Sequence, residues 1–297
     1  MDASPVAAGA PARLTPLIIA CLAATWVIWG STYLAIKWAL LSFPPYWQMG
    51  TRFLVAGAGL MLFMRVRGAA WPAARQWRNA AVIGALMLGG GMGGTALGEA
   101  TVSSGIIVAF IAVTPALIAL FNTVFGIRPA RLEALGIAVG LIGVLLLTQG
   151  SSFSASPAGL LAIASATLCW SLGSVLSQRR FPLAAGAVGF ASEMLCGGVV
   201  LMLISWLRHE QLSLPVDPKA LWSWVYLVVF GSLLAFNAYM LLLARAPAAL
   251  ASSYSFVNPV FAMLLGIALN GEVVSGYEWL AAAVILSGVV LVILGRR

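Results

Sequence analysis

Residues 26–40 read WVIWGSTYLAIKWAL, and this stretch decides the fold class of the chain. It is apolar enough to lie in a lipid bilayer, although it contains Ser31, Thr32 and Lys37. It belongs to a continuous apolar run of about twenty residues, the length that a helix needs to cross ~30 Å of hydrocarbon. A barrel strand would instead show about ten residues of alternating character. The stretch therefore predicts a transmembrane helix, whose polar residues lie near a helix end or face a cavity.

The whole chain has the composition of an integral membrane protein. Of its 297 residues, 62% are hydrophobic and 8% are charged, whereas about a quarter of a soluble domain is charged. Short connections separate the apolar runs, so the sequence predicts an all-α integral membrane protein without a separate extramembrane domain. The ten predicted transmembrane helices cover residues 17–41, 46–64, 80–97, 106–125, 132–148, 158–177, 187–207, 221–244, 248–269 and 277–294.

The basic residues predict how the helices are oriented in the membrane. Arginine and lysine in short connections are enriched on the cytoplasmic side. The side that holds the N-terminus carries Arg13, Arg65, Arg67, Arg75, Arg78, Arg128, Arg131, Arg179, Arg180, Arg245, Arg296 and Arg297. The other side carries only Arg208 and Lys219. We therefore expect a multi-pass protein of the cell inner membrane with cytoplasmic N- and C-termini.

Other binding classes find little support in the sequence. The basic residues form no dense patch, so the net charge of +8 does not indicate a nucleic-acid partner. Cys21, Cys169 and Cys196 lie in apolar runs without a C-x-x-C pair, and His209 is the single histidine. Neither a disulfide, nor a metal site, nor a cofactor is predicted.

Internal repetition divides the chain into two halves. A shift of 141 residues brings Trp29 onto Trp170 and Arg52 onto Glu193. We expect a disordered cytoplasmic tail at residues 1–15, a first five-helix repeat at 16–150 and a second at 156–297. An odd number of helices in each repeat gives the halves opposite orientations. Inverted repeats around a central cavity are typical of transporters.

Several segments resemble the drug/metabolite transporter superfamily. The quoted stretches are WGSTYLAIKWAL, TRFLVAG, VTPALIALFNTVF, SYSFVNPVFAMLLGIALNGE and SGVVLVI. The chain resembles its ten-helix EamA-type exporters, and among these the aromatic amino acid exporters. The resemblance implies two five-helix halves around a central cavity, and export of amino acids or other small metabolites. One departure is that Glu272 has Arg128 as its counterpart in the first half, so a symmetric acidic pair is not expected.

The first predicted helix offers an aromatic face and one lysine. Trp26, Trp29 and Tyr33 are spaced three and four residues apart and share one helix face. This face either packs against lipid and neighbouring helices or forms an apolar cavity lining. Lys37 either reaches the headgroups from near the helix end or lines the cavity and attracts a carboxylate. The predicted cavity residues are Trp29, Ser31, Tyr33, Lys37, Gly90, Trp170, Asn237, Tyr254 and Asn258.

Two charges are predicted deep within spans. Arg52 and Glu193 occupy equivalent positions in the two halves, and an unpaired charge in hydrocarbon is costly. They form a structural ion pair, act as a gate, or line an aqueous cavity. Glu193 is the only carboxylate predicted well inside a span. An arginine partner would keep it ionised, which disfavours proton coupling.

Glycines recur in the third predicted span. Gly89, Gly91 and Gly94 match G-x-G-x-x-G, but no strand precedes them and the run lies in the membrane. A dinucleotide site is therefore excluded. These glycines either let helices approach closely or expose backbone to a substrate.

The fourth, fifth and ninth predicted spans also contain helix-modifying residues. Pro115 and Pro259 occupy equivalent places and predict helix kinks, either static or involved in alternating access. Gly136, Gly140 and Gly143 indicate close helix packing in the fifth span.

These observations predict a membrane transporter and not an enzyme. Transport is expected to be secondary or facilitative, because the sequence contains no phosphate loop. The expected partners are a small-molecule substrate, such as an amino acid or amphipathic metabolite, and membrane lipid, with the chain as a monomer or homodimer. The alternatives are a multidrug carrier, a phosphorylated-metabolite or nucleotide-sugar carrier, and a non-transporting scaffold. An intramembrane enzyme would need HExxH or clustered aspartates, and neither occurs.

Overall fold

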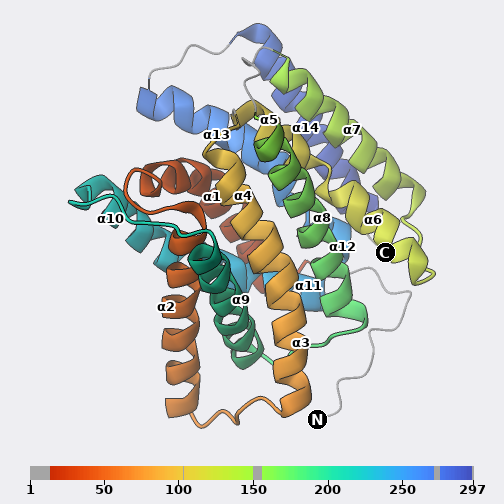
Figure 1. Ribbon diagram of the computed structural model, residues 1–297. Coiled ribbons are helices and arrows are strands. Elements are labelled where there is room, and N and C mark those ends of the chain that lie inside the picture. Colours follow the sequence, from red (N-terminus) through yellow and green to blue (C-terminus); the bar gives the residue numbers. More distant parts are fainter. Residues whose placement is uncertain (1–13, 103, 150–155, 271–274, 296–297) are drawn as a thin grey trace.

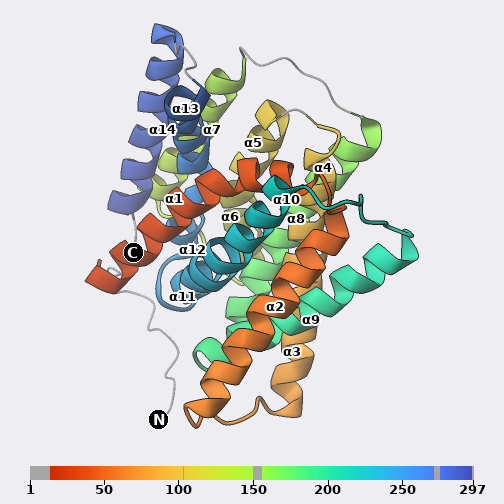
Figure 2. The same ribbon diagram turned by 90° about the vertical axis from the view of Figure 1, so that its left-hand side faces the viewer.

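The computed structural model describes residues 14–102, 104–149, 156–270 and 275–295, which form a bundle of helices (Figures 1 and 2). Among them, eight helical segments are long and apolar enough to cross a membrane, and Ala109–Val124 is a shorter apolar helix. This confirms the predicted all-α membrane fold. Most of the predicted tail lies outside the described residues, as do Arg13, Glu272, Arg296 and Arg297.

All ten predicted spans coincide with helical stretches in the described part of the chain. The first half contains α1 (Pro16–Ala39), α2 (Pro45–Val66), α3 (Ala74–Gly84), the π-helix η1 (Ala85–Met92), α4 (Gly93–Glu99), α5 (Ser104–Ala112), α6 (Thr114–Val124) and α7 (Arg131–Thr148). The second half contains α8 (Pro157–Arg179), α9 (Ala187–Leu207), α10 (Pro218–Tyr226), the π-helix η2 (Leu227–Phe236), α11 (Asn237–Arg245), α12 (Ala248–Ala251), α13 (Tyr254–Asn270) and α14 (Gly276–Gly295).

Local sequence explains where several helices begin. Proline occupies the first turn of α1, α2, α8 and α10, where its missing N–H is not needed. The Thr15 side chain caps α1 by accepting a hydrogen bond from the N–H of Ile18 (3.3 Å). Ser156 caps α8 in the same way through the N–H of Gly159 (3.0 Å).

The fourth and ninth spans are interrupted helices. Val113 separates α5 from α6, and Ser252 and Ser253 separate α12 from α13. The kink predicted at Pro115 is therefore a helix break followed by a proline in the first turn of α6. This differs from the prediction because proline is well tolerated where a new helix begins. Pro259 does lie inside a helix, α13.

The third and eighth spans both contain a π-helical segment that the sequence did not predict. In the third span η1 joins α3 to α4, and in the eighth η2 joins α10 to α11. These are the third helices of the two predicted repeats, so the feature is shared by both halves. Such π-helical segments are rare and occur frequently at functional sites.

Close helix pairs connect distant parts of the chain. α7 lies along α14 and α2 along α9, as both views show (Figures 1 and 2). A Cβ added at Gly136 would lie 2.6 Å from the backbone nitrogen of Val292, and one at Gly143 would lie 2.7 Å from that of Ile285. These contacts agree with the packing role expected of the fifth-span glycines.

Candidate functional site

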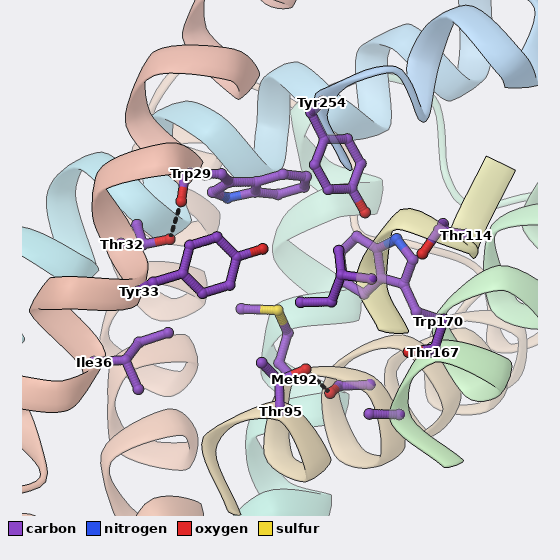
Figure 3. A pocket seen from close by; sticks show the side chains of 13 residues that line it. Trp29, Thr32, Tyr33, Ile36, Met92, Thr95, Thr114, Thr167, Trp170 and Tyr254 are labelled. Carbon is purple, nitrogen blue, oxygen red and sulfur yellow. Dashed lines mark hydrogen bonds between the residues drawn. The ribbon is translucent and has the colours of Figure 1, made fainter. Parts of the chain in front are cut away.

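A cavity lies where helices from both halves meet. Its volume is about 60 Å³, and its lining comes from α1, η1, α4, α5, α6, α8 and α13. Figure 3 shows the lining side chains, with the rings of Trp29, Tyr33 and Tyr254 around the space. α1 belongs to the first half and α8 to the second, so both halves contribute side chains to the lining of the cavity.

Four rings form an aromatic cluster beside this cavity: Trp29, Trp170, Tyr239 and Tyr254. The ring centroids of Trp29 lie 5.6 Å from Trp170, 5.1 Å from Tyr239 and 4.6 Å from Tyr254. Tyr239 also lies 5.1 Å from Trp170. Edge-to-face and tilted geometries at these distances are favourable beyond simple burial. The cluster forms a preorganised apolar wall contributed by both halves.

The two equivalent tryptophans each contact the π-helix of the opposite half. Trp29 of α1 donates a hydrogen bond from Nε1 to the carbonyl of Gly231 in η2 (3.4 Å). Trp170 of α8 lies against Gly91 of η1, where an added Cβ would be 3.1 Å from the ring. The first helix of each half thus packs on the third span of the other. The two π-helices therefore lie at the contact between the halves.

The polar atoms of the lining are mostly hydroxyl groups. Thr32 donates to the carbonyl of Trp29 (2.8 Å), Thr95 to that of Gly91 (2.9 Å) and Thr167 to that of Ile163 (2.9 Å). Each hydroxyl keeps acceptor capacity for a ligand. Of the residues that line the described cavity, none is charged. The lining suits a mainly apolar solute that offers a few hydrogen-bonding groups.

The structure brings four of the nine predicted cavity residues together at the cavity. These are Trp29, Tyr33, Trp170 and Tyr254. Figure 3 shows the hydroxyl groups of Tyr33 and Tyr254 pointing toward the space between them and Trp170. The threonines, Met92 and Ile111 complete much of the lining and were not singled out from the sequence. The three-residue spacing of Thr32 from Trp29 and the four-residue spacing of Thr95 from Gly91 were the available signal for these two threonines.

The other five predicted cavity residues lie outside the lining. Ser31 bonds the Tyr226 hydroxyl (2.6 Å), and Asn237 donates to the carbonyl of Leu233 (2.8 Å). Gly90 lies against Cys169, and Lys37 is exposed one residue beyond the lining Ile36. Asn258 is buried and can donate to the carbonyls of Tyr254 (3.0 Å) and Trp26 (3.1 Å). Ser31 and Asn237 thus bond neighbouring groups of the protein, and none of the five residues belongs to the lining.

Of the alternatives expected for Arg52 and Glu193, the described residues show no ion pair between them, and neither residue lines the described cavity. Arg52 donates from Nε to the Ser232 hydroxyl in η2 (2.7 Å), and its Cζ lies 4.7 Å from the centre of the Phe53 ring. Glu193 is fully buried, and its carboxylate oxygens have no hydrogen-bond partner among the described residues. The pairing was wrong because Arg52 faces η2, whereas α2 meets α9 through the closely packed Gly57 and Gly198.

Glu99 is a second buried carboxylate that sequence reasoning missed. The third span was expected to end at residue 97, but α4 continues through Glu99. Both carboxylate oxygens are inaccessible to solvent and lack hydrogen-bond partners in the described chain. The acidic residue just past a predicted helix end was the signal, since such ends are uncertain by a few residues.

Comparison with known proteins gives a family match along nearly the whole chain. The model of the EamA-like transporter family matches residues 15–149 and again residues 157–294. The two matches correspond to the two halves of the helix bundle.

Individual relatives agree with this match. The chain is 42% identical over 285 residues to the uncharacterized inner membrane transporter YedA of Escherichia coli K12, covering 96% of this chain and 92% of that protein. It is 27% identical to protein PecM of Dickeya dadantii, covering 89% of this chain and 88% of PecM. A solved crystal structure matches with a TM-score of 0.74 and 24% identity over 91% of this chain and 94% of its own, which shows the fold alone.

Proposed function

The chain belongs to the EamA-like transporter family, and we propose that this membrane transporter exports amino acids or similar small metabolites by alternating access. The proposed location is a bacterial-type inner membrane, with both termini in the cytoplasm. The orientation follows from the excess of arginine on the side of the N-terminus.

The uncharged aromatic cavity is the observation that carries the substrate proposal. Trp29, Tyr33, Trp170 and Tyr254 supply flat apolar surfaces, and Thr32 and Thr95 supply hydroxyl groups. Aromatic surfaces favour apolar and aromatic side chains through burial and edge-to-face contacts. Neutral polar groups suit the small polar part of such a solute. Amino acids with apolar or aromatic side chains match this combination.

The contacts between the halves support alternating access. Trp29 and Trp170 each pack on the π-helix of the opposite half, at the wall of the cavity. Inverted halves that move relative to each other expose such a central site first to one side and then to the other. Transport of this kind needs no nucleotide hydrolysis, in agreement with the secondary or facilitative mechanism proposed from the sequence.

Amphipathic drugs are an alternative substrate class that the aromatic lining would also suit. An amphipathic drug would also use the aromatic lining, so a multidrug carrier is the second candidate function. A carrier of phosphorylated metabolites or nucleotide sugars would need several cations around the phosphate. Arg52 and Lys37 are outside the described lining, which argues against that class.

Uptake of labelled L-phenylalanine and L-leucine into proteoliposomes tests the proposal. We expect saturable uptake that unlabelled apolar amino acids inhibit. Trp29→Ala is expected to lower uptake at least about tenfold, because one lost aromatic contact and its cavity amount to more than 1.4 kcal/mol. Trp206→Ala is the matched control, since Trp206 is 71% exposed on the outside of the bundle.

Each outcome has a clear meaning. Uptake that Trp29→Ala abolishes and Trp206→Ala leaves unchanged supports the cavity as the route. Folded protein that takes up no amino acid contradicts the proposed substrate. In that case, uptake of an amphipathic cation such as tetraphenylphosphonium would establish the multidrug alternative.

A further inference from the structure

Glu193 is a fully buried carboxylate in the membrane-spanning helix α9, about two turns from the start of that helix. Both carboxylate oxygens are inaccessible to solvent and have no hydrogen-bond partner among the described residues. An ionised carboxylate without a partner is costly in a low-dielectric interior. A proton on one of the two oxygens removes that cost, so this conformation favours the neutral carboxyl group.

The cation that was expected to keep Glu193 ionised is bound elsewhere. Arg52 donates from Nε to the Ser232 hydroxyl (2.7 Å) and from Nη1 to the sulfur of Met49 (3.5 Å). Its side chain is only 1% exposed, so it is fixed within the bundle by these contacts. Without an ion pair between Arg52 and Glu193, no partner in the described part of the chain holds the carboxylate in its ionised form.

The other ionisable groups around α9 do not bond this carboxylate either. The helices that pack against α9 are α2, α3, η1 and α11. Besides Glu193, these helices and α9 itself carry the following ionisable residues: Tyr46, Arg52, Arg65, Arg75, Arg78, Cys196, Tyr239 and Arg245. All of the arginines except Arg52 lie close to helix ends. Tyr239 bonds Ser174 (2.8 Å), and the ring of Tyr46 lies 5.6 Å from the Cζ atom of Arg208.

The face of α9 that carries Glu193 packs closely on the start of the π-helix η1. Gly197 follows Glu193 by four residues and therefore shares its helix face. A Cβ added at Gly197 would lie 2.7 Å from the Cβ of Leu88 in η1. A Cβ added at Gly84, where α3 passes into η1, would lie 2.7 Å from the carbonyl oxygen of Glu193. The buried carboxylate thus belongs to a tight contact between α9 and η1.

η1 also forms part of the cavity wall. Gly91 and Met92 line the cavity, and Trp170 of α8 lies against Gly91. Figure 3 shows the Met92 side chain in the space between Tyr33 and Trp170. η1 is therefore held between α9, which carries the buried carboxylate, and α8, which carries the aromatic wall. A displacement of η1 from α9 would change the shape of the cavity.

We propose that Glu193 is the proton-binding residue of this transporter. In the conformation that the structure describes, its carboxyl group is neutral and α9 packs closely on η1. When η1 separates from α9, water reaches the site, the O–H bond breaks and the proton passes to that water. This inference rests on the transport function proposed above, and it makes transport an exchange of one inward proton for one outward solute molecule.

Close packing and ionisation exclude each other at this contact, so one proton can control it. An ionised carboxylate within the membrane needs water or a cation. The contacts at Gly84 and Gly197 leave no room for an added methyl group, so water does not fit between these backbones in the packed state. The neutral form is therefore compatible with the packed contact, and the ionised form requires an open one. Proton binding thus shifts the balance between the two conformations.

Infrared spectroscopy of the lipid-reconstituted protein tests proton binding without any substrate. At about pH 7 exposed carboxylates are ionised, so a band from a protonated carboxyl group reports a buried one. We expect this band in the wild type and a clear loss of its intensity in Glu193→Gln. Glu278→Gln is the control, because Glu278 bonds only Ser275 near a helix end. A band of equal intensity in the wild type and in Glu193→Gln would overturn the proposal.

A second variant keeps this test decisive if Glu193→Gln does not fold. Glu99 is the other buried carboxylate without a partner in the described chain, so it can contribute to the same band. Glu99→Gln should retain the part of the band that belongs to Glu193. A band that disappears completely in Glu99→Gln, or a wild type without any such band, would overturn the proposal.

Transport in proteoliposomes tests the coupling. Wild-type vesicles with an acid interior are expected to accumulate labelled L-phenylalanine as protons leave. With the membrane potential clamped, one-for-one exchange across about one pH unit allows about tenfold accumulation. Glu193→Gln has no proton to release and should equilibrate the amino acid without accumulating it, whereas Glu193→Asp keeps a carboxyl group and should still accumulate it.

The outcomes separate the proton site from the substrate. Accumulation by Glu193→Gln equal to that of the wild type would overturn the proposal. Absence of amino acid uptake by the wild type would instead contradict the proposed substrate, while the infrared measurement still decides proton binding at Glu193.

Gly84→Ala tests the link between packing and proton binding. The added methyl group must push η1 away from the backbone of Glu193, so water reaches the carboxylate more easily. The pH at which half of the protonated band has disappeared is then expected to fall by about one unit. Gly59→Ala is the matched control, because nothing lies within 4 Å of a Cβ added there. An unchanged titration in Gly84→Ala would contradict the proposed link, whatever the variant does to stability.

Discussion

At the scale of single residues, buried hydrogen bonds fix the aromatic cluster in place. The hydroxyl of Tyr239 shares a hydrogen bond with that of Ser174 (2.8 Å), and both side chains are fully buried. Tyr239 packs between Trp29 and Trp170. Removal of one hydroxyl leaves the other without its cross-helix partner in a medium that cannot replace it.

A double-mutant cycle measures this bond. Tyr239→Phe and Ser174→Ala are each expected to lower the stability of the purified protein by about 1 kcal/mol. The double variant should lose less than the sum of the two, because the single variants break the same bond. Thermal unfolding in detergent provides the measurement. Strictly additive losses would show that the two hydroxyls do not stabilise each other.

At the scale of helices, the closest packing occurs where two backbones meet at glycine. A Cβ added at Gly288 of α14 would lie 2.5 Å from the backbone nitrogen of Gly140 in α7. Backbone atoms cannot move aside as a flexible side chain can, so the helices would have to separate. Small residues at such interfaces allow van der Waals contact between helices that apolar burial alone cannot hold together in lipid.

Two alanine substitutions test this packing. Gly288→Ala is expected to destabilise the protein by about 1–3 kcal/mol, as overpacking of a tight contact does. Gly59→Ala is the matched control, because nothing lies within 4 Å of a Cβ added there on α2. It should be neutral or slightly stabilising, since alanine favours helix. Melting temperatures and the yield of monodisperse protein are the readouts. Equal losses in both variants would contradict the packing argument.

At the scale of the whole molecule, the proposed orientation places both ends of the chain on one side. The connection between α2 and α3 lies with them, and the connection between α9 and α10 lies opposite. Ala70 and Ser213 are exposed residues of these two connections. The native Cys21, Cys169 and Cys196 are buried or partly buried and lie in helices. An introduced surface cysteine is therefore distinguishable from them.

Thiol labelling of intact cells measures this orientation. Ser213→Cys is expected to react with a membrane-impermeant maleimide, whereas Ala70→Cys should react only after the cells are permeabilised. The parent protein supplies the background from native cysteines. Labelling of Ala70→Cys in intact cells, with Ser213→Cys protected, would reverse the proposed orientation.

Much of the fold was predictable because the membrane imposes local requirements. An apolar run of about twenty residues must form a helix to satisfy its backbone in hydrocarbon. The ten predicted runs therefore coincide with helical stretches in the described residues. The equivalence of Trp29 and Trp170 was also visible from the internal repeat. The structure places both at the wall of one cavity.

The helix irregularities were less predictable. The breaks at Val113 and at Ser252 and Ser253 interrupt apolar runs that were expected to form continuous helices. Each π-helix contacts a tryptophan from the first helix of the opposite half: Trp170 packs against η1, and Trp29 packs against η2. The two partners of each contact lie far apart in the sequence. Hydrophobic periodicity, which compares neighbouring residues, therefore did not reveal the π-helices.

The sequence by itself determined the membrane location, the helical class, the approximate helix limits and the existence of two related halves. These properties follow from length and composition, which act locally and need no knowledge of neighbours. Only the tertiary structure decided that Arg52 bonds Ser232 instead of Glu193, and that the carboxylate oxygens of Glu99 are buried. The choice of partner for a buried charge depends on which helix faces which, and long-range packing alone sets that.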